Sequence, residues 1–293
     1  MGYLYSQDYL KQIQSSQLTQ LKTGDNVLTS AELAAEAEVK SYLVQRYLID
    51  NEFAALTQWS YSATYKAHNR VYLDATAYSA TSTYTLNTLA TYQSNVYRCT
   101  TAITVAEAWN ANHWTLVGAQ YAIYYAQYPN NVFDLYATYA KDDIVWYKDK
   151  RYKCKIPTKI IGQFTAMQYG TYNNIPVPNY YPDDATSGAI YWEDLGAYTI
   201  AANTAPTNTT YWTLGDNRNQ QILMYTIDMV LYHLHCRIPP QNIPELRQNR
   251  YDDAKAFLNA AAKGTITLDM PIIQPKQGNP IRWGGDVKQI NTY

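Results

Sequence analysis

The sequence predicts an α+β fold: a discontinuous helical bundle base with two small inserted all-β modules and an extended C-terminal arm. One observation is an excess of tyrosine, with 31 tyrosines against four phenylalanines. A tyrosine ring packs on one side while its hydroxyl meets water or a partner, so this excess favours wet-faced strands or interfaces. The tyrosines crowd in the middle of the chain, whereas both ends carry charged amphipathic patterns. We therefore predict a helical domain from residues 1–57 and 216–293, and β modules at 58–118 and 119–215.

The first half of the bundle is predicted to contain two helices. One covers residues 6–21, with Ser6 as a suitable N-cap. The second follows a capping box formed by Thr29 and Glu32 and ends near residue 48. Apolar residues at helical spacing predict the buried stripe of these helices: Tyr9, Leu10, Ile13, Leu33, Ala37, Leu43 and Tyr47.

The second half of the bundle is also predicted to contain two helices, at about residues 219–236 and 242–263. Pro239 and Pro240 separate them, Asn242 is a candidate cap of the second, and Gly264 ends it. Their predicted buried residues are Ile222, Leu223, Met229, Val230, Leu234, Leu246, Ala254, Phe257, Leu258 and Ala261. Because each half has an unpaired apolar stripe, we expect the two halves to form one domain around the insertion.

Two stretches of the bundle carry a resemblance to a known family. They are TSAELAAEAEVKSYLVQRYLI at residues 29–49 and ILMYTIDMVLYHLHCRIPPQNIPELRQNRYDDAKAFLNAAAKGTITL at residues 222–268. They resemble the small all-helical head–tail adaptor proteins of phages. The resemblance implies a homo-oligomeric ring of about twelve copies that joins the portal and capsid to the tail. The large middle insertion departs from that family.

The same resemblance implies where the protein acts and what it contacts. It would lie in the virion at the head–tail junction, after assembly in the host cytoplasm. Its partners would be the portal protein and tail or collar proteins, and DNA would pass through its lumen without sequence-specific binding. We expect the β modules to project from the ring periphery and to dock other virion proteins.

The C-terminal arm, residues 271–293, has few ways to form a core of its own. Prolines and glycines punctuate it, so it cannot continue as a helix. Its apolar residues nevertheless include Ile272, Ile273, Ile281, Trp283 and Val287. We predict that this arm becomes ordered only in the assembly, against a neighbouring subunit or the portal.

The middle of the chain contains an internal repeat. Residues 63–72 align without gaps with 137–146, Val96–Cys99 aligns with Arg151–Cys154, and residues 113–118 and 191–196 end the two copies alike. A third such ending lies at residues 211–215. Short β-prone segments in a fixed order predict a small β module present twice.

This repeat resembles the small chitin-binding-type carbohydrate modules of bacterial polysaccharide hydrolases. The resemblance implies that Trp114 and Trp192, together with Trp212 in the third ending, pack module cores. It also implies exposed aromatic residues that stack on sugar rings, for which the candidates are Trp59, Tyr72, Trp109 and Trp146. The alternative function is therefore a glycan-binding protein associated with a tail or fibre. Core or subunit packing is the competing role for each of these rings.

Composition excludes several other functions. The formal net charge is −1 and charged residues make up 16% of the chain, so no basic field for gripping DNA is expected. No apolar run is long enough for a membrane span, and no secretory signal is visible. Sparse cysteines favour buried thiols, with a Cys99–Cys154 disulfide as the alternative. No nucleophile, zinc or phosphate-loop motif occurs, so we expect no enzymatic activity, no cofactor and no metal.

Overall fold

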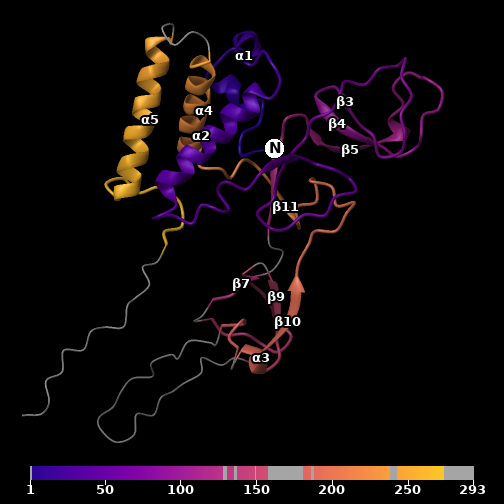
Figure 1. Ribbon diagram of the computed structural model, residues 1–293. Helices are drawn as coiled ribbons and strands as arrows, with labels where there is room; N and C mark the ends of the chain where they lie inside the picture. Colours follow the sequence, from indigo (N-terminus) through magenta and orange to yellow (C-terminus); the bar gives the residue numbers. More distant parts are fainter. Residues whose placement is uncertain are drawn as a thin grey trace, which may run out of the picture.

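The computed structural model describes residues 2–127, 131–134, 137–148, 150–157, 181–185, 188–237 and 243–273. Within these residues the fold is mixed α and β, with five α-helices and three small sheets (Figure 1). The predicted mixture of helices and strands is therefore confirmed, whereas the described residues form three small sheets where two β modules were predicted. None of the described helices is both long and apolar enough to cross a membrane.

The two ends of the chain share one helical core. The first end supplies a 3₁₀ turn, η1 (Asp8–Lys11), and the helices α1 (Ser15–Leu21) and α2 (Val27–Leu43), and the second supplies α4 (Gln220–His235) and α5 (Glu245–Lys263). Helix α4 lies between α2 and α5 and is buried along most of its length. The core cluster draws its residues from positions 3–53 and 222–270. We call this part of the molecule the helical base.

Two helix caps in the second half follow from local sequence. Asn219 precedes α4, and its side chain accepts hydrogen bonds from the backbone N–H groups of Gln221 and Ile222, both at 3.1 Å. Gly264 ends α5 in the left-handed conformation, with φ of 78°, which glycine adopts without strain. Helix α5 begins behind Pro244, and the predicted cap Asn242 lies outside the described residues.

The first half of the base differs from the prediction. The predicted helix over residues 6–21 is divided into η1 and α1, and helix α2 begins at Val27 instead of at the predicted capping box. The stripe that α2 buries is Val27, Ala31, Ala35, Val39 and Leu43. Leu33, predicted to be buried, is 62% exposed because α4 and α5 cover the other face of α2.

Three small sheets define three modules. Module A, residues 56–73, 120–127 and 198–215, holds β1 (Leu56–Gln58), β2 (Arg70–Tyr72), β6 (Ile123–Ala126) and β11 (Trp212–Leu214) in that order. Module B, residues 74–119, holds β3 (Leu89–Tyr92), β4 (Asn95–Cys99), the 3₁₀ turn η2 (Ala111–His113) and β5 (Trp114–Ala119). Module C, the described part of residues 131–197, holds β7 (Asn131–Val132), β8 (Ile144–Tyr147), β9 (Lys150–Cys154), helix α3 (Gly188–Tyr191) and β10 (Trp192–Ala197).

The same hydrogen-bonded loop recurs in all three modules. In each, a tyrosine hydroxyl accepts a bond from the backbone N–H of the residue five positions earlier and donates one to its carbonyl oxygen. The N–H distances are 2.6–2.7 Å and the carbonyl distances 3.1–3.3 Å for Tyr65 on Ser60, Tyr84 on Ser79 and Tyr139 on Asp134. Three residues after each tyrosine the backbone turns left-handed, at His68, Asn87 and Asp142. The three modules are therefore copies of one structural unit.

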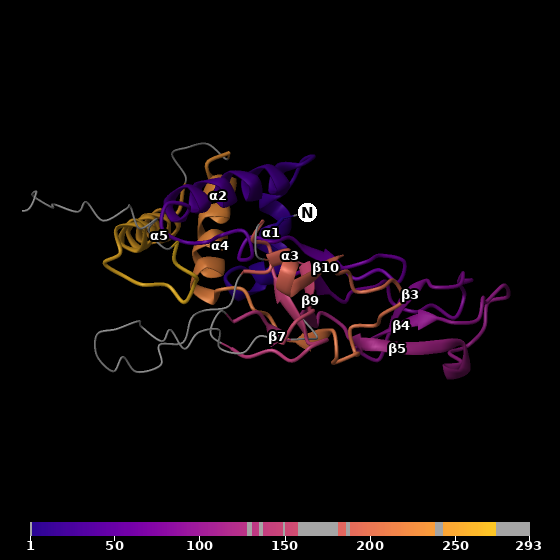
Figure 2. The same cartoon turned by 90° about the horizontal axis from the view of Figure 1, so that it is seen from below.

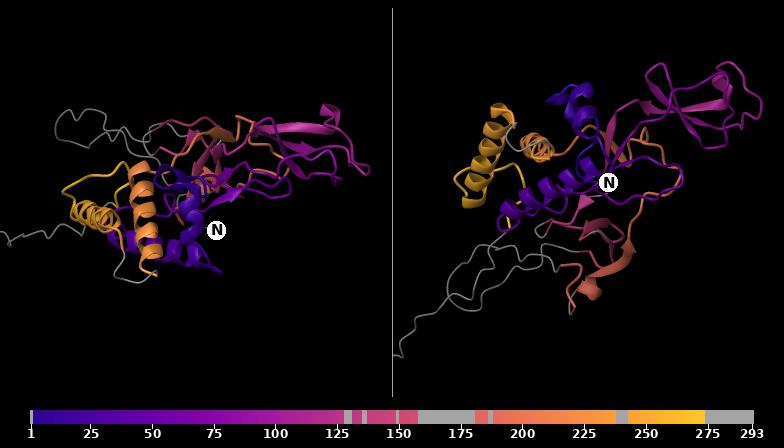
Figure 3. Two further views of the ribbon diagram at one scale, coloured as in Figure 1. Left: turned by 90° about the horizontal axis from the view of Figure 1, so that it is seen from above. Right: turned by 45° about the horizontal axis from the view of Figure 1, so that its top comes forward.

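The repeat was predicted with the wrong pairing of its segments. Residues 63–72 and Val96–Cys99 belong to different modules, because the segment that completes module A is β6. There Ala126 takes the position that Cys99 and Cys154 occupy, and it pairs with Trp212 as those cysteines pair with Trp114 and Trp192. Each of the two predicted ranges, 58–118 and 119–215, therefore contains parts of module A, because modules B and C are insertions into it. Figures 1 and 3 show them extending from module A in different directions.

Candidate functional site

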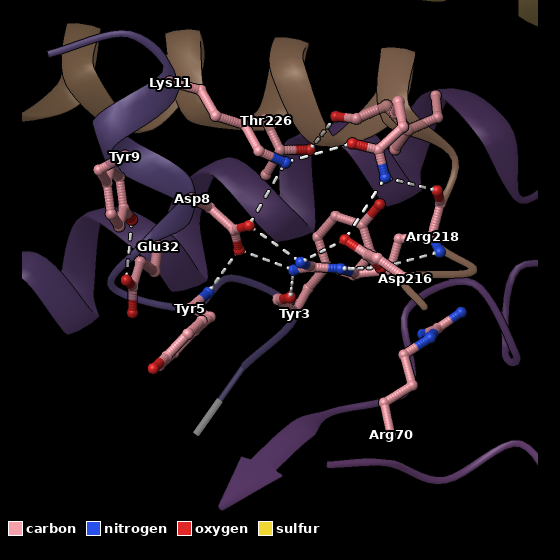
Figure 4. Close-up of polar contacts among 12 residues, drawn as sticks. Tyr3, Tyr5, Asp8, Tyr9, Lys11, Glu32, Arg70, Asp216, Arg218 and Thr226 are labelled. Atoms are coloured by element: carbon pink, nitrogen blue, oxygen red, sulfur yellow. Dashed lines mark hydrogen bonds and ion pairs between the residues drawn. The ribbon is translucent and has the colours of Figure 1, made fainter. Parts of the chain in front are cut away.

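A buried ionic network lies where module A joins the helical base. The chain leaves the base after Phe53 and returns through Asp216–Asn219, where the N–H of Asn219 donates to Glu52. Figure 4 shows Tyr3 and Asp8 of the N-terminal segment beside Asp216 and Arg218. Arg218 occupies the centre of the network, with a side chain that is 0% exposed. Since an unpaired buried charge is costly, this arginine must find partners inside the protein.

All five N–H donors of the Arg218 guanidinium are satisfied. Its Nη1 donates to the carbonyl oxygen of Tyr3 and to Asp8 Oδ2, both at 2.8 Å, and its Nη2 donates to Asp8 Oδ1 at 2.9 Å. Its Nε and Nη2 donate to the two carboxylate oxygens of Asp216 at 2.9 and 2.8 Å. Burial opposes the charge, but the bonds to Asp216 and Asp8 outweigh it and raise the pKa of Arg218 above its ordinary value. The pKa of Asp216 is correspondingly lowered: burial opposes this, and the bonds from Arg218 prevail.

A second arginine ties strand β2 of module A to the same network. Arg70 is 3% exposed, and its Nη1 donates to the carbonyl oxygen of Glu52 at 2.8 Å while its Nε donates to Asn217 Oδ1 at 2.6 Å. Glu52 Oε1 also accepts from the Tyr3 hydroxyl at 2.6 Å and from the backbone N–H of Asn219 at 2.8 Å. Burial lowers the pKa of Arg70 and, with the Glu52 carboxylate beside it, raises that of Tyr3. The network therefore fixes the orientation of module A on the base.

Module B carries a cluster of aromatic rings on one side of its sheet. Trp109 stacks on Tyr92, with ring centroids 4.1 Å apart and planes 7° apart, and its other neighbours include Trp114 at 5.3 Å. Tyr78 and Tyr97 meet Trp109 edge-on at 5.0 and 4.9 Å. Except for Trp114, these rings are half-buried, so each shows part of its surface to solvent. A ring cluster of this kind suits either a partner protein or the apolar face of a sugar.

Two of the predicted stacking residues lie in cores instead. Trp59 and Trp146 are each 2% exposed, which corrects their placement on a binding surface. Trp59 packs in the core of module A, and Trp146 packs edge-on against Tyr198 at 5.0 Å, where module C meets module A. Tyr72 is half-buried and stacks on Tyr5 of the base at 4.0 Å. Of these four candidates, Trp109 alone belongs to the module B cluster.

The other predicted residues fall as follows. Trp114, Trp192 and Trp212 are buried in modules B, C and A, with exposures of 6%, 2% and 1%. Ile272 and Ile273 are each 38% exposed, beside the end of α2, where the Ile273 N–H donates to the carbonyl oxygen of Arg46 at 2.8 Å. The remaining predicted arm residues, Ile281, Trp283 and Val287, lie outside the described residues.

The cysteines adopt the favoured arrangement. Cys99 and Cys154 are buried in different modules, and each thiol donates to a backbone oxygen two residues further on, at 3.0 Å. They are therefore not joined by a disulfide. Within the part of the chain that the structure describes, no group of three or more His, Cys, Asp or Glu side chains could hold a metal ion.

The junction residues carried no signal in the sequence. Asp8, Glu52, Arg70 and Arg218 lie far apart in the sequence and form no recognisable motif. Their burial is visible only once the fold brings the two chain crossings together. Comparison with known proteins adds no assignment, since no protein-family model and no curated protein matches the chain.

Proposed function

We propose that this chain is a structural virion protein that forms a ring between the portal and capsid of a phage and its tail, with DNA passing through the lumen. The observation that supports this most is a set of exposed apolar side chains on the helical base. Leu33, Val44 and Leu48, spaced along α2 and the turn that follows it, are 62%, 50% and 57% exposed. These side chains are available for contact with a neighbouring subunit.

The helical base and the β modules have separate roles in this proposal. The base resembles the adaptor family at residues 29–49 and 222–268 and forms the subunit contacts of the ring. Modules B and C extend away from it and dock other virion proteins at the periphery. The junction network around Arg218 holds module A, and with it both insertions, in a fixed orientation to the ring.

The test is the oligomeric state of the purified full chain. We expect light scattering after size exclusion to give a multiple of the 33.5 kDa subunit mass, and negative-stain images to show rings. Leu33→Asp should reduce assembly, whereas Leu214→Asp, at a 67% exposed position on β11 of module A, should not. A chain that stays monomeric at every concentration and is absent from purified virions would overturn the proposal.

A second function, glycan binding, is favoured by one observation: the half-exposed Tyr92–Trp109 stack of module B. Pull-down on chitin, cellulose and host-surface polysaccharides tests it. Tyr92→Ala should release the protein from the bound polysaccharide, while Tyr121→Ala, at a 46% exposed tyrosine outside the cluster, should leave binding intact. Failure to bind any of these polysaccharides would leave the cluster as a protein-docking surface.

A further inference from the structure

A cleft of about 380 Å³ separates the first turns of α2 from the edge of module A. Leu4, Leu33 and Leu56 give it apolar walls, and the stacked rings of Tyr5, from the base, and Tyr72, from module A, also line it. Leu33 is the most exposed of these, at 62%. The cleft therefore offers apolar contact area that the described residues leave uncovered.

The charged residues that line this cleft are all acidic: Glu32, Glu36 and Asp74. Glu36 has a partner, because Lys40 Nζ lies 2.6 Å from its Oε1. Glu32 accepts a hydrogen bond from Tyr9 and Asp74 accepts one from Gln120, yet no cationic side chain among the described residues forms a salt bridge with either. Burial raises the pKa of Glu32. An occupant of this cleft should be apolar and positively charged.

The end of this chain has that chemistry. Residues 274–293 contain Lys276, Arg282 and Lys288 against a single acidic residue, Asp286. Arg282 stands between Ile281 and Trp283, so two large apolar side chains flank a cation with a planar, multiply donating head group. These 20 residues reach about 70 Å when fully extended.

The start of the C-terminal segment and the cleft lie at opposite ends of α2. The last described residues meet the end of α2, where the Leu48 N–H donates to the carbonyl oxygen of Pro271 at 2.8 Å. The cleft lies beside the first turns of α2, which has 17 residues and is thus about 25 Å long. Figure 2 shows α2 lengthwise, with its last turns near α5 and its first turns on the side of the N-terminus. A contact between two different ends of a subunit is head-to-tail, the kind of interface that builds a ring when the rotation between neighbouring copies closes.

We infer that the Ile281–Trp283 segment of one copy binds in the cleft beside Leu33 of the next copy. This inference rests on the proposed ring function and names the contact that closes the ring. Leu33 and the ring pair of Tyr5 and Tyr72 would receive the apolar side chains, while Glu32 and Asp74 would face Arg282. The Tyr72 surface thus serves subunit contact in this arrangement.

A labelled peptide of residues 274–293, titrated by fluorescence anisotropy into a variant truncated after Ile273, tests the contact directly. We expect saturable binding that weakens by about tenfold or more when Leu33 is changed to Asp or when the peptide carries Arg282→Glu. Leu33 is exposed, so its replacement should leave the fold intact, and Leu214→Asp serves as the matched control on module A. Equal binding to the Leu33→Asp and unaltered proteins would overturn the inference.

Subunit mixing distinguishes a neighbour's arm from the same copy's arm. A Leu33→Asp chain keeps its arm but lacks a working cleft, and the truncated chain keeps its cleft but lacks the arm. Mixed together they should form one-to-one complexes, which neither forms alone, and absence of such complexes would overturn the inference. If the truncated chain still forms rings, the inference is wrong while the proposed function stands. If the full chain never assembles, the proposed function is wrong, and the peptide titration then tests binding to the cleft independently.

Discussion

Replacing Arg218 with methionine tests whether the junction network stabilises the helical base. Methionine keeps much of the length of the side chain but removes the charge and all five hydrogen bonds. The carboxylates of Asp8 and Asp216, 4% and 19% exposed, then lose their shared buried cation, and Asp8 keeps only the more distant Lys11, whose Nζ lies 3.7 Å from its Oδ1. Removing one partner of a buried ion pair typically costs 3–5 kcal/mol, so we expect the free energy of unfolding to fall by about 3–5 kcal/mol.

The assay is urea denaturation followed by far-UV circular dichroism, whose signal comes mainly from the helices of the base. Arg237→Met is the matched control, because Arg237 is exposed and should change stability by under about 0.5 kcal/mol. Arg218→Lys should fall between the two, since a lysine has three donors and cannot reproduce the paired contacts to two carboxylates.

A double-mutant cycle with Asp8→Asn separates the ion pair from general damage. The introduced asparagine would still accept the backbone N–H of Tyr5, which now bonds to Asp8 Oδ2 at 2.8 Å. The two changes together should therefore cost less than the sum of the single changes by about 1 kcal/mol or more. A loss below about 1 kcal/mol for Arg218→Met, or strict additivity in the cycle, would refute the idea that this network anchors the module.

Three further predictions concern separate parts of the molecule. Tyr84→Phe removes both hydrogen bonds of the module B loop, so amide exchange in β3–β5 should show a local loss of about 1–3 kcal/mol while module C is unchanged. Because the pKa of Asp216 is lowered in the folded protein, its carboxylate stabilises the fold at pH values above the pKa of an unfolded aspartate, about 3.9. This stability is lost as the pH falls through the lower pKa of the folded state. The free energy of unfolding, measured across acid pH, should show this loss in the unaltered protein and not in Arg218→Met. Cys236 is half-exposed whereas burial raises the pKa of Cys99, so a thiol reagent should modify Cys236 first, and equal rates would contradict the structure.

Local signals in the sequence predicted the helices of the second half well. The Asn219 cap and the Gly264 terminus act within a few residues of themselves, so no tertiary contact is needed to recognise them. The buried face of α2 was a different problem. Leu33 and Ala37 repeat at helical spacing, and so do Ala31, Ala35 and Val39, so periodicity alone could not choose between the two faces. The choice depends on where α4 packs, and the small alanines face it.

Module A was not predicted as a separate module, for a related reason. Its strands are divided by the two other modules, so its segments do not follow one another in the sequence. Ala126 also replaces the cysteine that marks the other two copies. What the copies share is a left-handed backbone turn and one tyrosine, Tyr65, Tyr84 or Tyr139, whose hydroxyl closes a loop. In a chain with 31 tyrosines, these three do not stand out before the structure is known. The burial of Arg218 could not be predicted, because a charged residue is expected to be exposed unless its buried partners are known.

The nesting of the modules explains how a large insertion is compatible with a fixed orientation of the modules on the helical base. Module B enters between β2 and β6 and module C enters after β6, before the chain returns through β11. Each of these strand pairs lies side by side in one sheet, so the ends of each insertion meet and cost little loop-closure entropy. Both insertions continue the chain of module A, which Arg70 on β2 and Arg218 on the returning chain fasten to the base. A partner bound on module B would therefore be held at a fixed position relative to the helical base, because Arg70 ties the strand to Glu52 and Arg218 ties the returning chain to Asp8. A flexible linker at the same crossings would let the modules bind the same partner, but it would fix neither the orientation of that partner nor its distance from the base.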